Sequence, residues 1–449
     1  MGRASLALLL SLVCLVLMLA SDGVAHRQKM RMERRPQVAE CQLDRLESLK
    51  PAYRIESEGG LTESWNHSDK ILRCAGVTLV RRTVQPKGLV LPSYTNAPQL
   101  LYYVRGSGIQ GMTIFPSCPE SFEEPEESER QEHREQHQKV HEIGEGDIIA
   151  IPAGIGYWFY NNGKTPLVVV ILIDTSNADN QLDGKPRRFY LAGNPEDEHG
   201  QATDGERSGG RNLFSRIHED LLSEIFGVRI ETVTKMKGAD DPRKNIVLVK
   251  EGLEVVRPDP GPRANGIEET ICTLRVREHV GSAARADIYT PHAGRIATLN
   301  SIKLPILADL HLSAERGVLY KNGVYTPHWN LNANSIVYVT GGIGRIQVVN
   351  NEGKSVFDGE MEEGEVLVIP QNFVAVMQAT GEEGFEWIAF KTAENAMINT
   401  LVGISSAIGA LPVDVVAQIF RVSKEEAYKL KIGRDQTSLF SVTSPSSSK

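Results

Sequence analysis

The chain has 449 residues, a hydrophobic fraction of 41%, a charged fraction of 24% and a formal net charge of −8 at pH 7. This length exceeds what one ordinary core needs and indicates two or three domains, and the composition is that of a soluble globular protein. The negative net charge gives a nucleic-acid partner no electrostatic support. The 40 glycines and 22 prolines suit a protein built from many short strands and turns.

The chain begins with the pattern of a secretory signal peptide, over residues 1–25. Arg3 is followed by the apolar run Leu6–Leu19, and Ala20 or Ala25 offers a small residue at which cleavage can occur. The apolar run is too short to span a bilayer comfortably, and no later segment is long and apolar enough to do so. We therefore expect a mature protein that enters the secretory pathway and has no membrane partner.

Several residues are candidates for covalent modification. Removal of the signal peptide removes Cys14 and leaves four cysteines, which are Cys41, Cys74, Cys118 and Cys272. An even number in a secreted chain indicates two disulfides, with three possible pairings, and the spacing matches no zinc motif. Asn66, two positions before Ser68, is a possible N-glycosylation site.

The chain contains an internal repeat of strand-rich pieces. The pieces are Gly88–Gly108 and Gly146–Gly154 in the first copy, and Gly323–Gly344 and Gly364–Asn372 in the second. Each copy has runs of β-branched and aromatic residues, then a turn glycine followed six positions later by a proline. Gly341 and Gly342 are expected to form a sharp turn. Apolar residues at helical spacing follow each copy, within Asn212–Val228 and Glu394–Lys431.

The offsets between the two copies place two insertions in the first half, near 119–140 and 180–211. Both are rich in charged and polar residues and are predicted to be mobile surface loops, because neither can bury enough apolar area to offset its ordering entropy. Beyond a proline- and glycine-rich stretch, apolar residues around Val276 suggest a strand that enters the second half. The expected order is a signal peptide over 1–25, an N-terminal domain over 36–256, a processing linker over 257–265, a C-terminal domain over 266–433 and a disordered tail over 434–449.

The stretch Asn265–Cys272, Asn-Gly-Ile-Glu-Glu-Thr-Ile-Cys, closely resembles the processing site of the 11S seed storage globulins, the legumins. The stretches Leu91–Pro98 and Pro327–Ile336 also match that family, and the resemblance extends from Cys41 to about Gly433. It implies a mainly β fold of tandem cupin domains, which are jelly-roll β-barrels, each with a peripheral helical segment.

The resemblance also implies a function and a maturation route. Legumins are seed storage proteins that are made as proproteins, form trimers, reach the protein storage vacuole and assemble as hexamers after an asparaginyl endopeptidase cuts them. The cut would fall between Asn265 and Gly266, in a linker that a protease can reach. The implied disulfides are Cys41–Cys74 within the acidic chain and Cys118–Cys272 between the acidic and basic chains. Without the second disulfide, a cut at this point is expected to split the molecule. Many legumins are food allergens, a property that these residues do not reveal.

A metal-dependent bicupin enzyme, such as an oxalate oxidase or decarboxylase, is the main alternative. Its sites need three imidazoles and a carboxylate, a set that suits manganese or iron. The corresponding residues here are Tyr94, Asn96, Gln99 and Tyr157 in the first half, and His328, Asn330, Asn334 and Ala375 in the second. Because one imidazole of six remains and no carboxylate, we predict no catalytic residue, no metal and no other cofactor. His328 is expected to lie at the barrel mouth and to bond to neighbouring amides.

A second alternative is a bicupin that binds a small ligand or a sugar, like the vicilin-related proteins. The motif Asn265–Cys272 argues against it, because vicilins lack that processing site.

Overall fold

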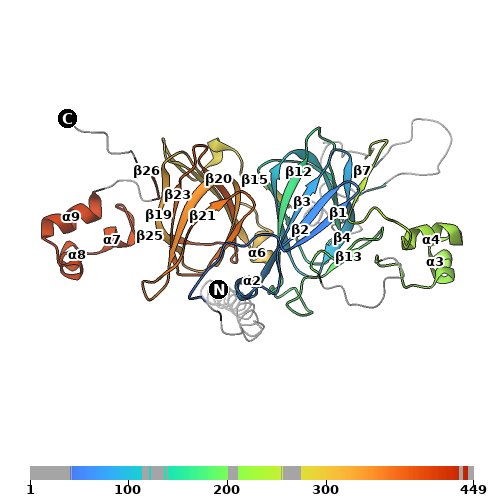
Figure 1. Cartoon of the computed structure of the whole chain (residues 1–449), viewed down its shortest axis with the longest axis horizontal. Coiled ribbons are helices and arrows are strands. Elements are labelled where there is room, and N and C mark those ends of the chain that lie inside the picture. The colour runs from blue at the N-terminus through green and yellow to red at the C-terminus, as the bar shows by residue number, and fades with distance from the viewer. Residues whose placement is uncertain are drawn as a thin grey trace, which may run out of the picture.

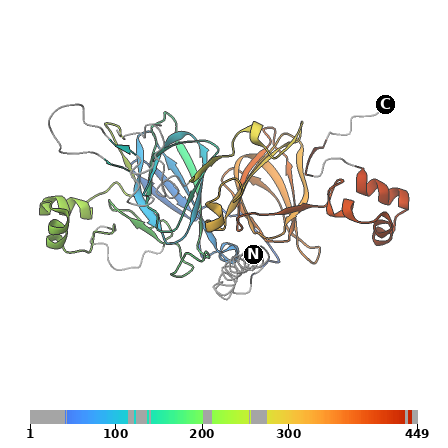
Figure 2. The same ribbon diagram turned by 180° about the vertical axis from the view of Figure 1, so that it is seen from behind.

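Two β-barrels lie side by side, and short helices extend from the two far ends of the pair (Figures 1 and 2). The structure, a computed structural model, describes residues 41, 43–113, 121–122, 136–137, 140–200, 211–253, 255, 275–433 and 438–442. Several predicted features lie outside the described residues: the signal peptide, Cys118, Cys272, the pair Asn265 and Gly266, and most of the insertion near 119–140.

The first barrel is made of two antiparallel sheets. One has the order β1-β2-β3-β12-β5-β10-β15 and the other the order β13-β4-β11-β6-β9, with β14 beside β4. The strands are β1 (Tyr53–Ser57), β2 (Gly60–Ser64), β3 (Val77–Val84), β4 (Gly88–Thr95), β5 (Gln99–Arg105), β6 (Ser107–Met112), β9 (Val140–Gly144), β10 (Asp147–Ile151), β11 (Tyr157–Tyr160), β12 (Leu167–Asp174), β13 (Arg188–Tyr190), β14 (Ile246–Leu248) and β15 (Arg277–His279), with a small separate hairpin of β7 (Ser121–Phe122) and β8 (Gln136–His137). Successive residues of β12 are buried, as expected for a central strand covered on both faces.

The second barrel is one continuous sheet of eleven strands. They are β16 (Ile288–Thr290), β17 (Gly294–Leu299), β18 (Ser313–Leu319), β19 (Gly323–Asn330), β20 (Ser335–Val349), β21 (Ser355–Glu362), β22 (Val366–Ile369), β23 (Val374–Ala379), β24 (Phe385–Lys391), β25 (Ile398–Thr400) and β26 (Leu439–Ser441). The start of β20 pairs with β22 and β24, and its end pairs with β21 and β23. The expected sharp turn at Gly341 and Gly342 is wrong, because the strand bends there through a register shift and continues.

The helices are shorter than their apolar spacing predicts. They are α2 (Lys70–Ala75), α3 (Glu219–Phe226), α4 (Ile230–Lys237), α6 (Leu307–Leu310), α7 (Ala407–Ala410), α8 (Val413–Phe420) and α9 (Lys424–Ile432), with one 3-10 turn at Ala283–Arg285. Gly227 and Arg421 take left-handed conformations that end α3 and α8. The start of the predicted helical segment Glu394–Lys431 instead contains β25, which pairs with β19. Within the described residues, none of these helices combines the length and apolarity needed to cross a membrane.

The prediction of a mobile loop over 180–211 is wrong for the part that the structure describes, residues 180–200. This part contains β13, which pairs with β4, and it carries Glu198, whose side chain is buried. The prediction judged order by the apolar area that the segment can bury. Ion pairs inside the barrel anchor this segment instead.

The two halves exchange segments. The strand expected near Val276 forms as β15, but it pairs with β10 of the first barrel and not with the second barrel. In the other direction, the N-terminal segment Leu46–Lys50 lies along the second barrel, where Leu49 N donates to Val366 O at 2.7 Å. A disulfide between Cys41 and Cys74 ties the beginning of this segment to α2, and it is one of the two pairings that the legumin resemblance implied.

One hydrophobic core crosses the boundary between the barrels. It joins residues of β3, β5 and β12 to residues of β20, β22 and β24. At the boundary, the rings of Trp65 and Tyr338 meet edge to face with centroids 6.0 Å apart, and Arg81 Nη1 donates to the Tyr338 hydroxyl at 3.1 Å. The barrels are therefore packed on one another as a single unit.

We predict that Gly342→Ala destabilises the protein by about 2–4 kcal/mol, because it adds a side chain to a left-handed residue and drives its Cβ into backbone. The φ angle is +72°, and a Cβ would lie 2.1 Å from Gly384 O. The control is Gly353→Ala, where φ is +74° but a Cβ meets nothing within 4 Å. Urea unfolding measures both variants, and equal losses of stability would contradict the close packing around this bend.

Candidate functional site

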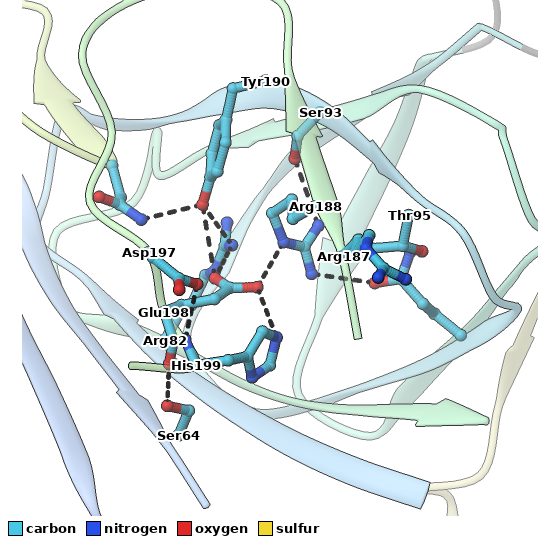
Figure 3. A network of polar contacts seen from close by, with 12 residues as sticks. Ser64, Arg82, Ser93, Thr95, Arg187, Arg188, Tyr190, Asp197, Glu198 and His199 are labelled. Carbon is cyan, nitrogen blue, oxygen red and sulfur yellow. Dashed lines mark hydrogen bonds and ion pairs between the residues drawn. The ribbon is translucent and has the colours of Figure 1, made fainter. Parts of the chain in front are cut away.

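The interior of the first barrel holds a buried carboxylate between two guanidinium groups (Figure 3). Glu198 accepts a hydrogen bond from Arg82 Nη2 at 2.7 Å on one oxygen and from Arg188 Nε at 2.5 Å on the other. Arg82 comes from β3 and Arg188 from β13, so the ion pairs link opposite sheets of the barrel. The exposed fraction of each of the three side chains is 2% or less, and pairing therefore meets the main requirement for burying such charges.

Further polar groups extend this network. Asn245 Nδ2 donates to the Tyr190 hydroxyl at 2.9 Å and to Glu196 O at 3.0 Å, and the Ser64 hydroxyl donates to the backbone carbonyl of Glu198. These bonds position the chain around Glu198 from three separate stretches of sequence (Figure 3). The network therefore holds residues 180–200, the described part of the 180–211 insertion, inside the fold.

Arg188 also contacts Gln99 and Tyr157, two of the residues that the sequence comparison set against the ligands of a bicupin enzyme. Its Nη2 donates to Gln99 Oε1 at 3.1 Å, and its Nη1 donates to the Tyr157 hydroxyl at 3.0 Å. The guanidinium carbon lies 5.7 Å from the centroid of the Tyr157 ring. A fixed positive charge among these groups opposes the binding of a divalent cation.

Tyr94 and Asn96, the other two residues of the first half that were compared with metal ligands, contact residues other than Arg188. Tyr94 stacks on Phe189 with ring centroids 5.0 Å apart, and Asn96 Oδ1 accepts from Arg187 N at 2.8 Å. Sequence reasoning missed Arg188 because it lies in the stretch interpreted as a surface loop. The one available signal was the apolar pair Phe189 and Tyr190 within that otherwise polar stretch.

The charges of this network shift the protonation of its members. Burial raises the pKa of Glu198, but attraction to Arg188 and Arg82 outweighs burial and holds that pKa well below its usual value. Burial lowers the pKa of the neighbouring His199 to about 4, so this imidazole is neutral near pH 7. At that pH the network therefore consists of two cations and one anion.

The second barrel also places an ammonium group in its interior. Lys391 Nζ donates to Asn330 Oδ1 at 3.1 Å and to Ser335 Oγ at 2.9 Å. It lies 3.7 Å from Glu315 Oε2, and both side chains are nearly fully buried. Burial lowers the pKa of Lys391, and the attraction of Glu315 opposes that shift. The second half thus also has a buried basic side chain that donates to polar groups of the interior, although its residues differ.

His328 is not at the barrel mouth, so that expectation is wrong. Its exposed fraction is 2%, and its ring stacks on Tyr325 with centroids 3.8 Å apart. Its Nδ1 lies 2.8 Å from the backbone carbonyl of Thr326, so this bond goes to its own strand and not to an amide side chain. Burial lowers the pKa of His328 to about 4. The imidazole is therefore packed against Tyr325 in the core. To bind a metal, it would have to face other ligand side chains instead.

The remaining residues at ligand positions of this half do not supply what a metal needs. Asn334 Oδ1 accepts from Gln371 N at 3.0 Å, and Ala375 sits in β23 opposite His328. Across the described residues, no group of three or more histidine, cysteine, aspartate or glutamate side chains is placed to hold a metal ion. The arrangement in both barrels suits the stabilisation of a packed interior.

The proposed glycosylation residue, Asn66, lies on the surface just before α2. Its side chain is exposed, and its Oδ1 accepts from Ser68 N at 3.0 Å.

Comparison with known proteins agrees with the fold. The cupin family profile matches residues 46–197 and 280–428, one match for each barrel. The chain is 48% identical over 427 residues to the 11S globulin seed storage protein Ana o 2.0101 of Anacardium occidentale, covering 90% of this chain and 93% of that protein. It superposes with a TM-score of 0.81 on the coconut allergen cocosin, at 43% identity, covering 90% of this chain and 100% of that one. A recombinant pro-11S globulin of pumpkin gives the same TM-score and identity over 89% of this chain and 99% of that one.

The protein is thus a tandem cupin. Within the cupins, the chain belongs to the 11S globulin family of seed storage proteins, which confirms the legumin resemblance and the mainly β bicupin fold. A vicilin from Capsicum annuum, at 15% identity and a TM-score of 0.68, shares the fold alone.

We predict that Glu198→Gln costs about 3–5 kcal/mol of stability, because it leaves two buried guanidinium groups without a counter-charge. Asp183→Asn is the matched control: Asp183 also pairs with an arginine of the same insertion, Arg187, but half of its side chain is exposed. That exposed pair should contribute at most about 1 kcal/mol. Chemical unfolding compares the two, and a small effect of Glu198→Gln would contradict the role given to the carboxylate.

We predict a loss of stability on acidification that depends on His328. Its pKa is about 4 when folded and about 6.5 when unfolded, so between these values the unfolded chain binds the proton and stability falls as pH falls. His328→Phe should reduce the loss between pH 7 and 4 by on the order of 2–3 kcal/mol. The control is His292→Asn at an exposed position. Unfolding measured across this range decides, and a variant with the wild-type pH dependence would contradict the prediction.

Proposed function

We propose that this protein is a nutrient reservoir of the seed that carries no catalytic activity. The observation that supports this most directly is the filling of both barrel interiors by paired side chains, with Arg188 donating to Gln99 and Lys391 donating to Asn330. Membership of the 11S globulin family supports the same conclusion. The storage role includes passage through the secretory pathway, after removal of the signal peptide, to the protein storage vacuole.

The maturation route is part of the proposal. An asparaginyl endopeptidase cuts between Asn265 and Gly266, and the resulting acidic and basic chains are joined by a disulfide between Cys118 and Cys272. The sequence motif and its position in a proline- and glycine-rich stretch support this. Asn66 is a proposed glycan acceptor, in keeping with its exposure.

The protein assembles as a homotrimer and, after processing, as a hexamer. This is supported by two apolar helix faces at opposite ends of the protomer (Figure 1). The residues are Leu221, Ile225 and Phe226 on α3, and Val415, Ile419 and Phe420 on α8, each with an exposed fraction between 41% and 65%. Because the two faces are alike but lie at opposite ends, contact between them is head to tail, and such contacts form a ring when the rotation from one protomer to the next closes.

We predict that Ile225→Asp weakens the association of protomers by more than about tenfold, because it puts a charge into an apolar contact. The side chain is 65% exposed in the single chain, so folding of the protomer should be unaffected. Leu182→Asp is the control, since Leu182 is 61% exposed and does not belong to α3 or α8. Light scattering at several concentrations measures the mass, and a wild type that is monomeric throughout would contradict the assembly.

The maturation proposal is tested by gel electrophoresis of the native protein. We expect one band near the full mass without reductant and two smaller bands with reductant, because the chain is cut but tethered. A single full-length band under both conditions would overturn the processing step.

A further inference from the structure

Each half of the chain contributes a segment to the barrel of the other half. Residues from Val276 to Val280 follow the proposed processing site and lie on the first barrel, while Leu46–Lys50 at the start of the acidic chain lies on the second. We infer that, once the chain is cut, this reciprocal exchange holds the acidic and basic chains together, and that the disulfide between Cys118 and Cys272 is dispensable for holding them. The inference rests on the proposed processing.

The basic chain is held at both ends of β15. Ala150 N donates to Val276 O at 2.9 Å before the strand, and Val280 N donates to Gly146 O at 2.8 Å after it. The side chains of Val276 and Val280 are 1% and 6% exposed and belong to the core that both barrels share. Removing this segment would expose apolar surface and break backbone bonds along the edge of a sheet, so it docks as an integral strand.

Asp147 of the acidic chain anchors the same segment. Its carboxylate accepts from Arg277 Nη2 at 2.9 Å, and His279 Nδ1 lies 3.0 Å from its other oxygen. Gly144 N donates to it at 2.8 Å, and the exposed fraction of the side chain is 1%. One buried carboxylate of one chain thus binds two side chains of the other, and charge-assisted bonds of this kind are the stronger class.

The acidic chain holds the second barrel by a strap formed by Cys41 and residues 43–50. Leu46 N donates to Val356 O at 2.8 Å, and Leu49 exchanges backbone bonds with Val366. Cys41 is tied to Cys74 of the first half, and Trp65 Nε1 donates to Leu49 O at 3.0 Å. The strap is therefore attached to the first barrel through Cys41 and Leu49. Between these two attachments, Leu46 binds the second barrel.

The exchange has a consequence for how the stored protein is opened. Reduction of the disulfide that spans the cut leaves both exchanged segments in place. Release of the basic chain then requires unfolding, or proteolysis of one exchanged segment. Reduction alone is not the step that separates the chains.

The test uses the full-length variant Cys118→Ser/Cys272→Ser, cut with an asparaginyl endopeptidase. A denaturing gel first verifies two chains, and size exclusion in native buffer then follows them. We expect both chains in one peak at the elution volume of the disulfide-linked protein, and separate elution would overturn the inference. Failure of the cut would count against the processing proposal alone, and a specific protease site placed at 265–266 then supplies the same break. If the variant fails to fold, cut wild-type protein with reductant makes a more severe comparison, because the reductant also opens Cys41–Cys74 at the start of the strap.

Asp147→Asn tests the anchor. In the cut, reduced protein it should weaken retention of the basic chain about tenfold and lower the urea concentration at which the chains part, because two charge-assisted bonds are lost. Glu145→Gln is the matched control, an exposed carboxylate two positions away. Arg277→Gln, with a side chain 38% exposed, makes the same test from the basic chain if Asp147→Asn fails to fold. Equal behaviour of all three variants would show that Asp147 anchors nothing.

Discussion

The carboxylate of Glu198, buried between Arg82 and Arg188, is the interaction on which the first barrel depends. A buried charge is tolerated only when it is paired, so each of the three groups requires the others. Glu198 and Arg188 both come from a polar insertion that has little apolar area to bury. Their pairing draws that insertion into the barrel, and the guanidinium then lies beside Gln99 and Tyr157, where a cupin enzyme would need metal ligands.

The second barrel reaches a similar result with different residues. Lys391 binds Asn330 and Ser335, with Glu315 nearby, while His328 is held against Tyr325. Both halves of a duplicated chain therefore place a basic side chain in the interior, beside residues compared with the ligands of a metal-binding cupin. This shared outcome connects the chemistry of the interior to a storage role, because a reservoir needs a stable packed body and no reactive centre.

Much of the fold follows from local patterns in the sequence. The repeat of strand-rich pieces was predictable, because β-branched runs and turn glycines act over a few residues. Three of the departures depend on long-range contacts. The bend of β20 at Gly342 depends on the approach of Gly384, the partner of β15 lies more than a hundred residues away in β10, and Arg188 is placed by Glu198 and Tyr157. Spacing along the chain carries no information about such partners.

The sequence shows which residues stand at the compared ligand positions, but it does not show which basic side chains contact them. At the compared ligand positions, the sequence has Gln99, Tyr157 and Asn330 in place of imidazoles and carboxylates. The basic side chains that fill the interiors are not evident from it, because neither Arg188 nor Lys391 belongs to a recognisable motif.

The central claim is that paired basic side chains, Arg188 and Lys391, fill both interiors in place of a metal. Elemental analysis of the purified native protein by mass spectrometry tests it most directly. We expect manganese, iron and zinc each far below one atom per chain after dialysis against buffer without chelator. A stoichiometric transition metal, retained in the wild type and located inside either barrel by anomalous diffraction, would contradict the claim.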